Sequence, residues 1–356
     1  TGCLRSTGSH RRLQRYGITM KKHEPARMGK EKALALFSED IYTLAERATA
    51  VKRAVLGSRA DYACFIIDRN INVTNICSAR CNFCAFYRDG DDPEAFTLSL
   101  DEILEKVGEL VRLGGTQVMI QGGLDQRFGL SFYMAILAGI RKHYPSVYIH
   151  SFSPAEVHYL ATIENRPVFD ILCELKDAGL QSLPGAAEIL VDEHRRMVSP
   201  HKLSTAEWLE VMKCAHRAGM RSTATMTFGM GEKLADRIEH LFLIRDLQEK
   251  TGVFRAFIPW TFSKPHTCLD VEETTGEDYL KTVAVSRLVL DNVDHIHAGW
   301  VTEGFQLSEM ALRMGASDMG GILMEENVVK ATGITHTTSQ ELMIEVIENA
   351  GLKPAI

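Results

Sequence analysis

The sequence predicts an α/β protein built as a (β/α)8 barrel of the TIM type with helices before the first strand. Short apolar runs alternate about eight times with amphipathic stretches of roughly 15–30 residues, the pattern of parallel strands joined by helices. No glycine-rich Rossmann signature follows the first run, so a barrel fits better than a doubly wound sheet. Polar and glycine-rich groups follow most runs, as on the face of a barrel that carries the chemistry.

Each element follows from its local pattern. Apolar residues recur at helical spacing over residues 31–57, which predicts one or two leading helices. The predicted strands are Cys64–Ile67 running on through Ile71–Thr74, Gln117–Gln121, Val147–Ser151, a weak strand at Asp170–Leu172 or Gln181–Leu183, Ser222–Thr227, Arg255–Pro259, His295–Trp300 and Asp318–Leu323. The predicted helices between them include Leu100–Leu113, Phe132–Tyr144, Thr205–Ala218, Leu234–Glu249 and Asp278–Leu290.

Composition narrows the class of protein. The chain has 356 residues, is 45% hydrophobic and 24% charged, and has a net charge of −6, which gives no reason to expect a nucleic-acid partner. No apolar run has the length of a membrane helix, and no apolar leader precedes the chain, so we expect a cytoplasmic protein. We expect residues 1–30, which are basic, to be a disordered or mis-annotated extension rather than a transit peptide. Residues 31–356 are predicted to form a single barrel domain with a C-terminal extension.

Three of the eight cysteines lie within eight positions, and the other five are scattered. Eight cysteines in so long a chain are too sparse for a disulfide scaffold. Because three of them cluster in a sequence without secretory features, metal binding is the better interpretation.

Cys77, Cys81 and Cys84 follow a predicted strand directly and stand at positions i, i+4 and i+7. Iron–sulfur clusters usually take four thiolate ligands. Three ligands hold three corners of a 4Fe–4S cluster and leave the fourth iron open for a substrate or cofactor. A structural zinc site would need a fourth ligand and typically a second C-x2-C pair. A buried helix face is the other alternative, but Phe83 directly before the last cysteine makes the spacing specific for a cluster.

The segment Cys77-x3-Cys81-x-Phe83-Cys84 resembles the motif of the radical S-adenosylmethionine (SAM) superfamily. The resemblance implies a 4Fe–4S cluster on Cys77, Cys81 and Cys84, with Phe83 in the cofactor site. In that superfamily SAM binds the open iron through its amino and carboxylate groups. One-electron reduction then cleaves SAM to methionine and a 5′-deoxyadenosyl radical, which takes hydrogen from the substrate.

The resemblance extends over about residues 33–352 and narrows the family. One set of motifs is similar to the branch that contains the deazaflavin (F420 precursor) synthases and two radical enzymes of the futalosine menaquinone pathway. A second set is most similar to the cyclic dehypoxanthine futalosine synthases. The first set is Cys84–Arg88, Gln121–Leu124, His150–Pro154 with Glu156, Leu183–Gly185 and Ala187–Ile189, and the second is Thr223–Met226, Phe228–Gly229, Ala256–Trp260, Ala284–Arg287 and Met324–Val328.

Phe228 and the Pro259-Trp260 pair carry the choice of subfamily. The sister aminofutalosine synthases tend to have Tyr in place of Phe228 and lack the Pro-Trp pair. One position departs from the pattern, since the relatives generally have His where this chain has Met230. That departure puts the subfamily activity in question if the histidine has a direct role.

The resemblance also assigns roles to residues outside the cysteine motif. Gly122 and Gly123 match the turn that receives the amino group of SAM, although Gly-Gly also serves a simple tight turn. Glu188 and Arg195 are expected to contact the ribose or amine of SAM and its carboxylate, respectively, since Arg suits a carboxylate bidentately. The alternative is a surface helix pair. Glu156 is the candidate base, and a helix cap beside Ser153 is the alternative.

Further residues are candidates for the substrate pocket. Tyr87, Trp260 and Phe228 are expected to wall the substrate, although aromatics in a barrel are more often core. Either Arg287 or Arg255 is expected to bind the benzoate carboxylate, and the sequence does not choose between them. Three strand histidines receive no role, because lone strand histidines are more often satisfied packing residues: His150, His295 and His297.

The resemblance implies an enzyme that closes a ring. The 5′-deoxyadenosyl radical abstracts a ribose-type hydrogen of dehypoxanthine futalosine, and the carbon radical attacks the benzoate ring. Loss of a proton and an electron gives cyclic dehypoxanthine futalosine for menaquinone biosynthesis. The partners are this small molecule and an electron donor such as flavodoxin or ferredoxin. The alternatives are an aminofutalosine or deazaflavin synthase and, in a different class, an iron–sulfur electron carrier.

Overall fold

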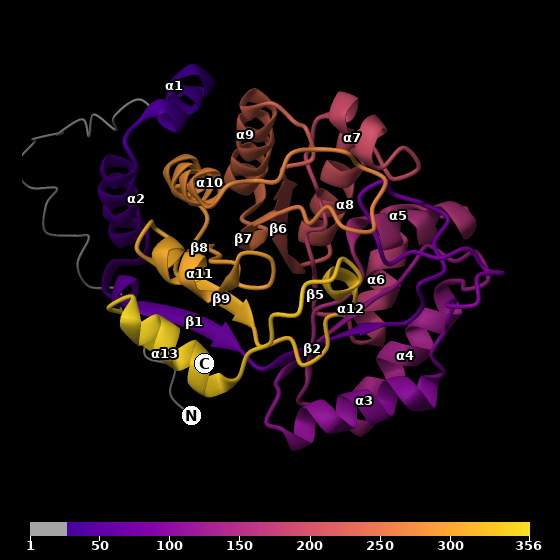
Figure 1. Cartoon of the computed structure of the whole chain (residues 1–356). Coiled ribbons are helices and arrows are strands. Elements are labelled where there is room, and N and C mark those ends of the chain that lie inside the picture. Colours follow the sequence, from indigo (N-terminus) through magenta and orange to yellow (C-terminus); the bar gives the residue numbers. More distant parts are fainter. Residues whose placement is uncertain (1–26) are drawn as a thin grey trace, which may run out of the picture.

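The computed structural model describes residues 27–356 and contains a parallel barrel surrounded by helices (Figure 1). In these residues the strands are short, and every strand pair among them is parallel. The strands are β1 (Tyr62–Ile66), β2 (Asp68–Asn72), β3 (Gln117–Gln121), β4 (Tyr148–Ile149), β5 (Ser182–Leu183), β6 (Arg221–Phe228), β7 (Phe254–Thr261), β8 (His295–Ile296), β9 (Asp318–Gly321) and β10 (Lys353–Ala355).

The strands close into a ring. β2 pairs with β3, β3 with β4, and β5 through β8 pair in order. Single bridges complete the circuit, His150 with Ser182 between β4 and β5 and His297 with Asp318 between β8 and β9. β9 pairs with β1, and one residue, Ile67, separates β1 from β2 in the chain. The described residues therefore confirm the predicted TIM-type barrel, with β10 added outside beside β1.

Helices connect successive strands and cover the outside of the barrel (Figure 1). Those after the leading helices lie in the crossovers that parallel strands require. The helices are α1 (Lys30–Ala35), α2 (Ile41–Leu56), α3 (Leu100–Arg112), α4 (Leu130–His143), α5 (Pro154–Ile163), α6 (Val168–Ala178), α7 (Asp192–Val198), α8 (Thr205–Arg217), α9 (Leu234–Thr251), α10 (Gly276–Val289), α11 (Gly304–Leu312), α12 (Asn327–Lys330) and α13 (Gln340–Asn349).

Local sequence explains where several helices begin. Ser99, Ser153 and Ser204 each cap a helix with the side-chain hydroxyl, and a Glu three residues later returns the bond to the cap residue. Such capping boxes satisfy backbone N–H groups that have no partner within the helix. The buried faces then pack on the barrel, as where Trp208 of α8 stacks on Phe254 of β7 with 6.0 Å between ring centroids.

Of the two positions predicted for the strand before β6, only one is a strand in the structure. Residues 170–172 lie inside α6, and Ser182–Leu183 form β5. Both segments are apolar and buried, but Ile171, Leu172 and Leu175 recur at helical spacing within α6. A buried helix face and a buried strand cannot be separated by apolar content alone, and the length of the segment decides.

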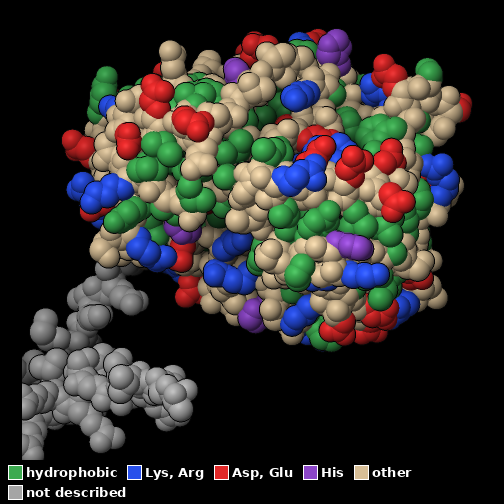
Figure 2. Space-filling model, turned by 90° about the horizontal axis from the view of Figure 1, so that it is seen from below, with side chains coloured by type: hydrophobic (Ala, Val, Ile, Leu, Met, Phe, Trp, Pro, Cys, Tyr) green, Lys and Arg blue, Asp and Glu red, His purple; other side chains and the backbone are tan. Residues whose placement is uncertain are grey.

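Acidic and basic side chains are interspersed over the face shown in Figure 2. Among residues 27–356, no helix combines the length and apolar composition needed to cross a membrane. The predicted extension at residues 1–30 falls almost entirely outside the described residues.

Candidate active site

The three clustered cysteines lie in the loop that follows β2, at the carboxyl end of the barrel strands. Backbone hydrogen bonds fold this loop on itself. The N–H of Cys77 donates to the carbonyl of Arg88 at 3.2 Å, and the N–H of Arg88 donates to the carbonyl of Asn75 at 2.8 Å. The Asn75 side chain also donates to the carbonyl of Glu94 at 3.0 Å. The loop is therefore fixed at its base, and its cysteine segment projects from a closed ring of backbone bonds.

Burial keeps two thiols of the cysteine loop protonated unless a metal binds them. Burial raises the pKa of the Cys81 thiol to about 12. Burial also raises the pKa of Cys84, against the opposing effect of the N–H groups of Phe86 and Tyr87. Metal ions deprotonate such thiols outright, and N–H groups directed at sulfur stabilise the charge. The backbone N–H of Leu124 also donates to Cys77 Sγ at 3.3 Å.

The donor set distinguishes a cluster from a single ion. Among the described residues, no group of three or more His, Cys, Asp or Glu side chains could hold one metal ion. Each cysteine of a three-cysteine cluster site binds a different iron, so its sulfurs do not need to converge on one point. Thiols on one short loop with N–H groups directed at two of them therefore fit a 4Fe–4S cluster better than a zinc ion.

Gly122 and Gly123 follow β3 and make different contacts. A Cβ added to Gly123 would lie 2.0 Å from the carbonyl oxygen of Ile76 and 2.9 Å from the Cβ of Cys77. A Cβ on Gly122 would meet only ordinary contacts, 3.5 Å from the backbone nitrogen of Thr74. Gly123 is therefore the residue that lets the cysteine loop pack directly on the end of β3.

Glu156 accepts a hydrogen bond from the same glycine turn. The side chain is 3% exposed and lies at the start of α5. One carboxylate oxygen accepts from the backbone and hydroxyl of Ser153, both at 2.7 Å, and the other accepts from the N–H of Gly122 at 3.0 Å. Burial raises the pKa of Glu156 to about 7, against these hydrogen bonds. The predicted cap is thus present, and the same carboxylate also fixes the glycine turn.

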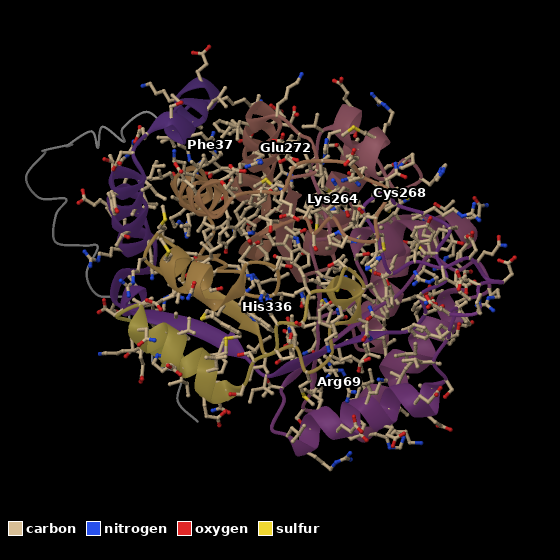
Figure 3. All side chains as sticks on the ribbon, viewed as in Figure 1. Phe37, Arg69, Lys264, Cys268, Glu272 and His336 are labelled. Atoms are coloured by element: carbon tan, nitrogen blue, oxygen red, sulfur yellow. The ribbon has the colours of Figure 1, made fainter. Side chains whose placement is uncertain are left out.

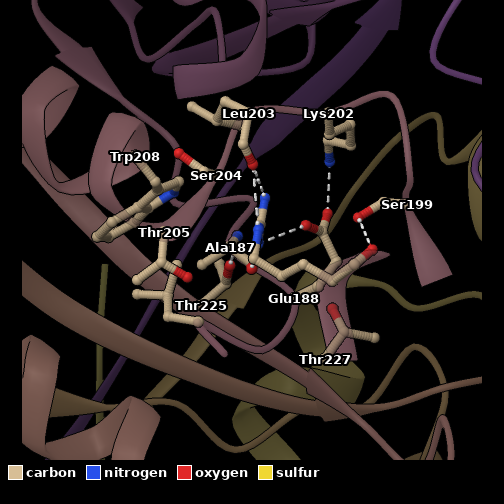
Figure 4. Close-up of polar contacts among 12 residues, drawn as sticks. Ala187, Glu188, Ser199, Lys202, Leu203, Ser204, Thr205, Trp208, Thr225 and Thr227 are labelled. Atoms are coloured by element: carbon tan, nitrogen blue, oxygen red, sulfur yellow. Dashed lines mark hydrogen bonds and ion pairs between the residues drawn. The ribbon is translucent and has the colours of Figure 1, made fainter. Parts of the chain in front are cut away.

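The structure brings Glu188 and Arg195 together. It also places Lys202 on the carboxylate of Glu188 (Figure 4). The Glu188 carboxylate accepts from Arg195 Nη1 at 3.3 Å and from Lys202 Nζ at 2.5 Å. Although burial opposes the charge on Lys202, the facing carboxylate of Glu188 raises its pKa. The alternative of a surface helix pair is excluded, because Glu188 and Arg195 are 4% and 3% exposed.

Most donors of Arg195 are already used within the chain. Its Nε and Nη2 donate to the carbonyl of Leu203 at 3.1 and 2.8 Å, and Nη1 donates to the carbonyl of Ala187 at 2.5 Å. Arg195 therefore anchors the segment that carries Lys202, and its predicted contact with the carboxylate of SAM stays a prediction. Lys202 had no signal in the sequence, because a lone lysine after a short helix is typical of a solvated surface.

Lys202 also links this buried group to the cysteine loop. Its Nζ lies 5.8 Å from the centre of the Phe83 ring. Phe83 stands between Asn82 and Cys84, and the N–H of Asn82 donates to the carbonyl of Val198 at 2.9 Å. The carboxyl end of α7 and Lys202 thus contact the cysteine loop at Asn82 and Phe83.

A long loop between β7 and α10 reaches the cysteine loop as well. The backbone N–H of Cys268 donates to the carbonyl of Asn82 at 2.8 Å. The hydroxyl of Ser263 donates to Thr332 Oγ1 at 2.8 Å. Figure 3 labels Lys264 and Cys268 of this loop. The loop therefore joins the cysteine segment to the C-terminal part of the chain.

The predicted aromatic walls divide into two groups. Trp260 Nε1 donates to Thr227 Oγ1 of the neighbouring strand at 2.7 Å, and the next residue, Phe228, packs on Arg237 of α9, so the indole lies on the inner side of β6 and β7. Phe228 follows Thr227 directly and so faces the opposite side of the strand. It is fully buried with the Arg237 guanidinium 4.5 Å from its ring centre. Phe228 is core, and the expectation that it walls the substrate is wrong.

The two arginine candidates are also separated. Arg287 is fully buried on α10, where its guanidinium donates to the carbonyls of Leu290, Val293 and Asp294. It therefore closes the end of its own helix outside the barrel and is not a substrate ligand. Arg255 lies near the start of β7 and donates to Gln117 Oε1 at 3.2 Å, at the end of the barrel opposite the cysteine loop.

Met230, which departs from the family pattern, is a packing residue in this chain. Its side chain is fully buried. Its backbone N–H and that of Gly229 donate to the carboxylate of Glu232 at 2.8 and 2.9 Å. Glu232 in turn accepts from Arg237 Nε at 2.7 Å. The loop after β6 is thus held by Glu232 rather than by the residue at position 230.

The three strand histidines differ in a way that the sequence does not reveal. His150 Nδ1 pairs with Ser182 Oγ at 2.6 Å, and His295 Nδ1 pairs with Ser317 Oγ at 3.1 Å. Both ring nitrogens of His297 are buried without a hydrogen-bond partner. The expectation of a satisfied packing residue holds for His150 and His295 and is wrong for His297.

Comparison with known proteins agrees with this geometry. Residues 71–244 match the radical SAM superfamily, and residues 251–356 match the CofH/MqnC C-terminal region. Solved structures with the same fold include methylornithine synthase PylB, with a TM-score of 0.74, 17% identity and coverage of 94% of this chain and 96% of that one. The hydrogenase maturase HydG from Carboxydothermus hydrogenoformans has a TM-score of 0.73 at 18% identity, covering 92% and 76%.

Closer relatives carry two different names. The chain is 41% identical to the cyclic dehypoxanthine futalosine synthase of Streptomyces coelicolor, over 92% of this chain and 84% of the relative. It is 38% identical to the protein of that name from Halalkalibacterium halodurans, over 95% and 92%. It is also 42% identical to the 5-amino-6-(D-ribitylamino)uracil–L-tyrosine 4-hydroxyphenyl transferase of Methanothermobacter thermautotrophicus, over 92% and 91%.

The barrel, the cysteine loop and these matches define a radical SAM enzyme, and the cofactors of that class are a 4Fe–4S cluster and SAM. The chain belongs to the radical SAM family that contains the cyclic dehypoxanthine futalosine synthases and these 4-hydroxyphenyl transferases.

Proposed function

We propose that this enzyme converts dehypoxanthine futalosine to cyclic dehypoxanthine futalosine in menaquinone biosynthesis. Relatives of that name from two bacteria match nearly the whole chain. Identity alone does not separate them from the transferases, one of which is 42% identical. The observation that carries the choice is Trp260, the residue of the subfamily's Pro-Trp pair, which lies on the inner side of the barrel and is anchored to Thr227.

Cys77, Cys81 and Cys84 are the proposed ligands of the cluster. Their loop is closed at its base and is held by Gly123 and by the segment around Val198. With cluster and SAM bound, the site supplies a 5′-deoxyadenosyl radical. The chain's own contribution is to fix the loop, so that the three thiols keep their positions while one corner stays free of protein ligands.

The turn at Gly122 is proposed to receive the amino group of SAM, and the Glu188–Arg195–Lys202 group is proposed to receive its polar remainder. The N–H of Gly122 is already bonded to Glu156, which orients the peptide. Lys202 lies between Glu188 and the Phe83 ring of the cysteine loop. These contacts support a SAM site between the ends of β3 and β5.

Glu156 stays the proposed proton acceptor for the last step of ring closure. A pKa of about 7 suits a base that works near neutral pH. Each carboxylate oxygen has two lone pairs. The oxygen that accepts from Gly122 therefore keeps one lone pair for a proton.

Two assays test the proposed function. The reconstituted enzyme is reduced anaerobically with SAM and dehypoxanthine futalosine, and we expect 5′-deoxyadenosine and a product two hydrogens lighter than the substrate. The same enzyme is given 5-amino-6-(D-ribitylamino)uracil and L-tyrosine in parallel. Formation of the hydroxyphenyl adduct in the second assay, with no cyclised product in the first, would show that the transferase function is the correct one.

We further propose a flavodoxin or ferredoxin as the electron donor and the cytoplasm as the place of action. Reduction by purified flavodoxin and its reductase, in place of a chemical reductant, tests the first of these. Activity in a washed membrane fraction and its absence from the supernatant would contradict the second.

A further inference from the structure

β2, which continues β1, and β9 form a polar wall inside the barrel together with His297, which directly follows β8 and bridges Asp318 of β9. On this wall both ring nitrogens of His297 and the side-chain oxygen of Asn70 are buried without a hydrogen-bond partner. Leaving such a group unpaired costs about 1–3 kcal/mol, so most buried polar atoms in proteins are paired. Three unpaired atoms on one wall therefore indicate a place that a ligand completes.

The strand alternation places these side chains inside the barrel. Arg69 points outward, where it bonds to Glu109 of α3 and to Glu325, and Figure 3 shows it beside α3. Ile71 belongs to the hydrophobic core under the helices. Because successive side chains of a strand face opposite sides, Asn70 faces the interior. Ile296 pairs with Phe257, whose ring lies 5.9 Å from that of His240 on α9, so Ile296 faces the helices and His297 faces the interior.

Two glycines of β9 make room between the flanking strands. A Cβ on Gly320 would lie 2.1 Å from His297 Nε2, and a Cβ on Gly321 would lie 1.8 Å from Asp68 Oδ1. Gly320 also has a φ of +72°, which side chains rarely adopt. β9 pairs irregularly with β1 at this level. The two glycines therefore leave room for the imidazole and for the Asp68 carboxyl, which pack directly on the backbone of β9.

The wall leads to a cavity at the mouth of the barrel. Asn70 Nδ2 donates to Glu326 Oε2 at 3.1 Å. Glu326 is one of the residues that line a cavity of about 240 Å³ formed by the segments that follow β8 and β9, together with Trp300 and Ile322. Through Glu326, Asn70 therefore adjoins this cavity, which lies at the same end of the barrel as the cysteine loop.

The unpaired atoms define the chemistry of the ligand. Asn70 Oδ1 needs a donor, and a neutral imidazole needs one donor and one acceptor. Hydroxyl groups supply both. The nearby charges do not select an anion or a cation, because Lys330 and His336 line the cavity together with Glu326. We propose that Asn70 and His297 bind the hydroxylated pentose part of the substrate.

This inference rests on the proposed function and specifies the part of the substrate that the wall recognises. The alternative relatives are named for a ribityl compound, so a pentose-derived chain is common to both candidate reactions. Recognition of the hydroxyl groups also holds the carbon from which hydrogen is taken, since the hydroxyls and that carbon belong to the same five-carbon unit.

The test uses the reconstituted holoenzyme with SAM and measures the Kd of dehypoxanthine futalosine by calorimetry. His297→Phe keeps an aromatic ring and removes both nitrogens, and His297→Gln keeps one donor and one acceptor. We expect about tenfold weaker binding for H297F, partial recovery for H297Q and about tenfold weaker binding for Asn70→Leu. Asn292→Leu is the matched control, because its amide oxygen is also buried and unpaired but its Nδ2 bonds to Arg245 and Glu249 outside the barrel.

A thermal-unfolding scan separates binding from packing. A ligand-binding nitrogen destabilises the free protein, so the Tm of H297F without substrate is expected to equal or exceed that of the wild type. A substrate analogue that lacks one pentose hydroxyl is expected to bind H297F and the wild type with closer affinities than the full substrate does. Loss of affinity together with a lower Tm, and without recovery in H297Q, would assign His297 a packing role.

The outcomes distinguish the two proposals. Unchanged Kd values in H297F and N70L, with tight binding by the wild type, would overturn this inference and leave the proposed function intact. Binding of 5-amino-6-(D-ribitylamino)uracil but not of dehypoxanthine futalosine, again weakened by both variants, would overturn the proposed function and support the pentose site. A wild type that binds neither compound would overturn both.

Discussion

Replacement of Gly123 by Ala is expected to abolish cluster assembly, whereas replacement of Gly122 is not. The new Cβ at position 123 would lie 2.0 Å from the Ile76 carbonyl oxygen and 2.9 Å from the Cβ of Cys77. Since side-chain carbons rarely approach closer than about 3 Å, the backbone that carries Cys77 has to move by about 1 Å. Both close contacts lie on the cysteine loop, so that loop is where the movement falls.

The magnitude decides between damage to the fold and damage to the site. Forcing a methyl group into a packed contact costs about 1–3 kcal/mol, which a barrel of this size tolerates. A shift of about 1 Å in one ligand is severe for a cluster, because metal–ligand distances at a protein site are held within about 0.2 Å. We therefore expect G123A to fold and to lose most of its iron.

The adjacent glycine provides the matched control. A Cβ on Gly122 would meet Thr74 and Val73 at 3.5 Å, an ordinary contact. Iron and sulfide per chain, measured after anaerobic reconstitution, are expected to stay at the wild-type level in G122A. If Gly122 receives the amino group of SAM, the KM for SAM rises in that variant. Full iron content in G123A, or equal iron loss in both variants, would refute the reasoning.

Three other changes have defined outcomes. Burial raises the pKa of Glu156 from 4.5 to about 7, so the folded protein keeps a proton that the unfolded chain releases, and stability falls as pH rises through that window. Glu156→Gln should remove this pH dependence, a change of about 3 kcal/mol in the free energy of unfolding between those two pH values, measured by urea unfolding. If the variant and the wild type show the same pH dependence, the Glu156 carboxyl titrates normally. Lys202→Met breaks one of the two buried ion pairs of Glu188 and should destabilise the cluster-free protein by about 3 kcal/mol; a change below 1 kcal/mol would show that Arg195 suffices. Cys81→Ser should remove the cluster, whereas Cys268→Ser, whose backbone alone contacts the cysteine loop, should keep its iron; iron loss in both would implicate Cys268 as a ligand.

The residue pattern was enough to predict the barrel and the position of the cysteine loop. Alternation of apolar runs and helical stretches reports directly on parallel strands and their crossovers, because burial sets the period of the side chains. The weak segment near β5 was ambiguous because two buried apolar stretches lie close together, Ile171–Leu172 in a helix and Ser182–Leu183 in a strand. The local pattern does not show which of the two is the strand, and the pairing of Ser182–Leu183 with β6 decides it.

The site residues also divide into those that local spacing predicts and those that depend on tertiary packing. Cys77, Cys81 and Cys84 were visible because their spacing lies within one loop. Phe228 was misplaced because the sequence does not show which side of β6 faces the helices, and in the structure Phe228 packs on Arg237 of α9.

By itself the sequence determined the class of enzyme, since a three-cysteine loop after a strand carries its chemistry locally. Only the tertiary structure decided which buried groups are free to act. Glu188 and Lys202 meet across 14 residues of chain. His297 lies over a glycine of the next strand with both nitrogens unpaired, whereas His150 and His295 each find a serine. The identity of a side chain gives its capacity for hydrogen bonds, and the packing of distant segments determines whether that capacity is already used.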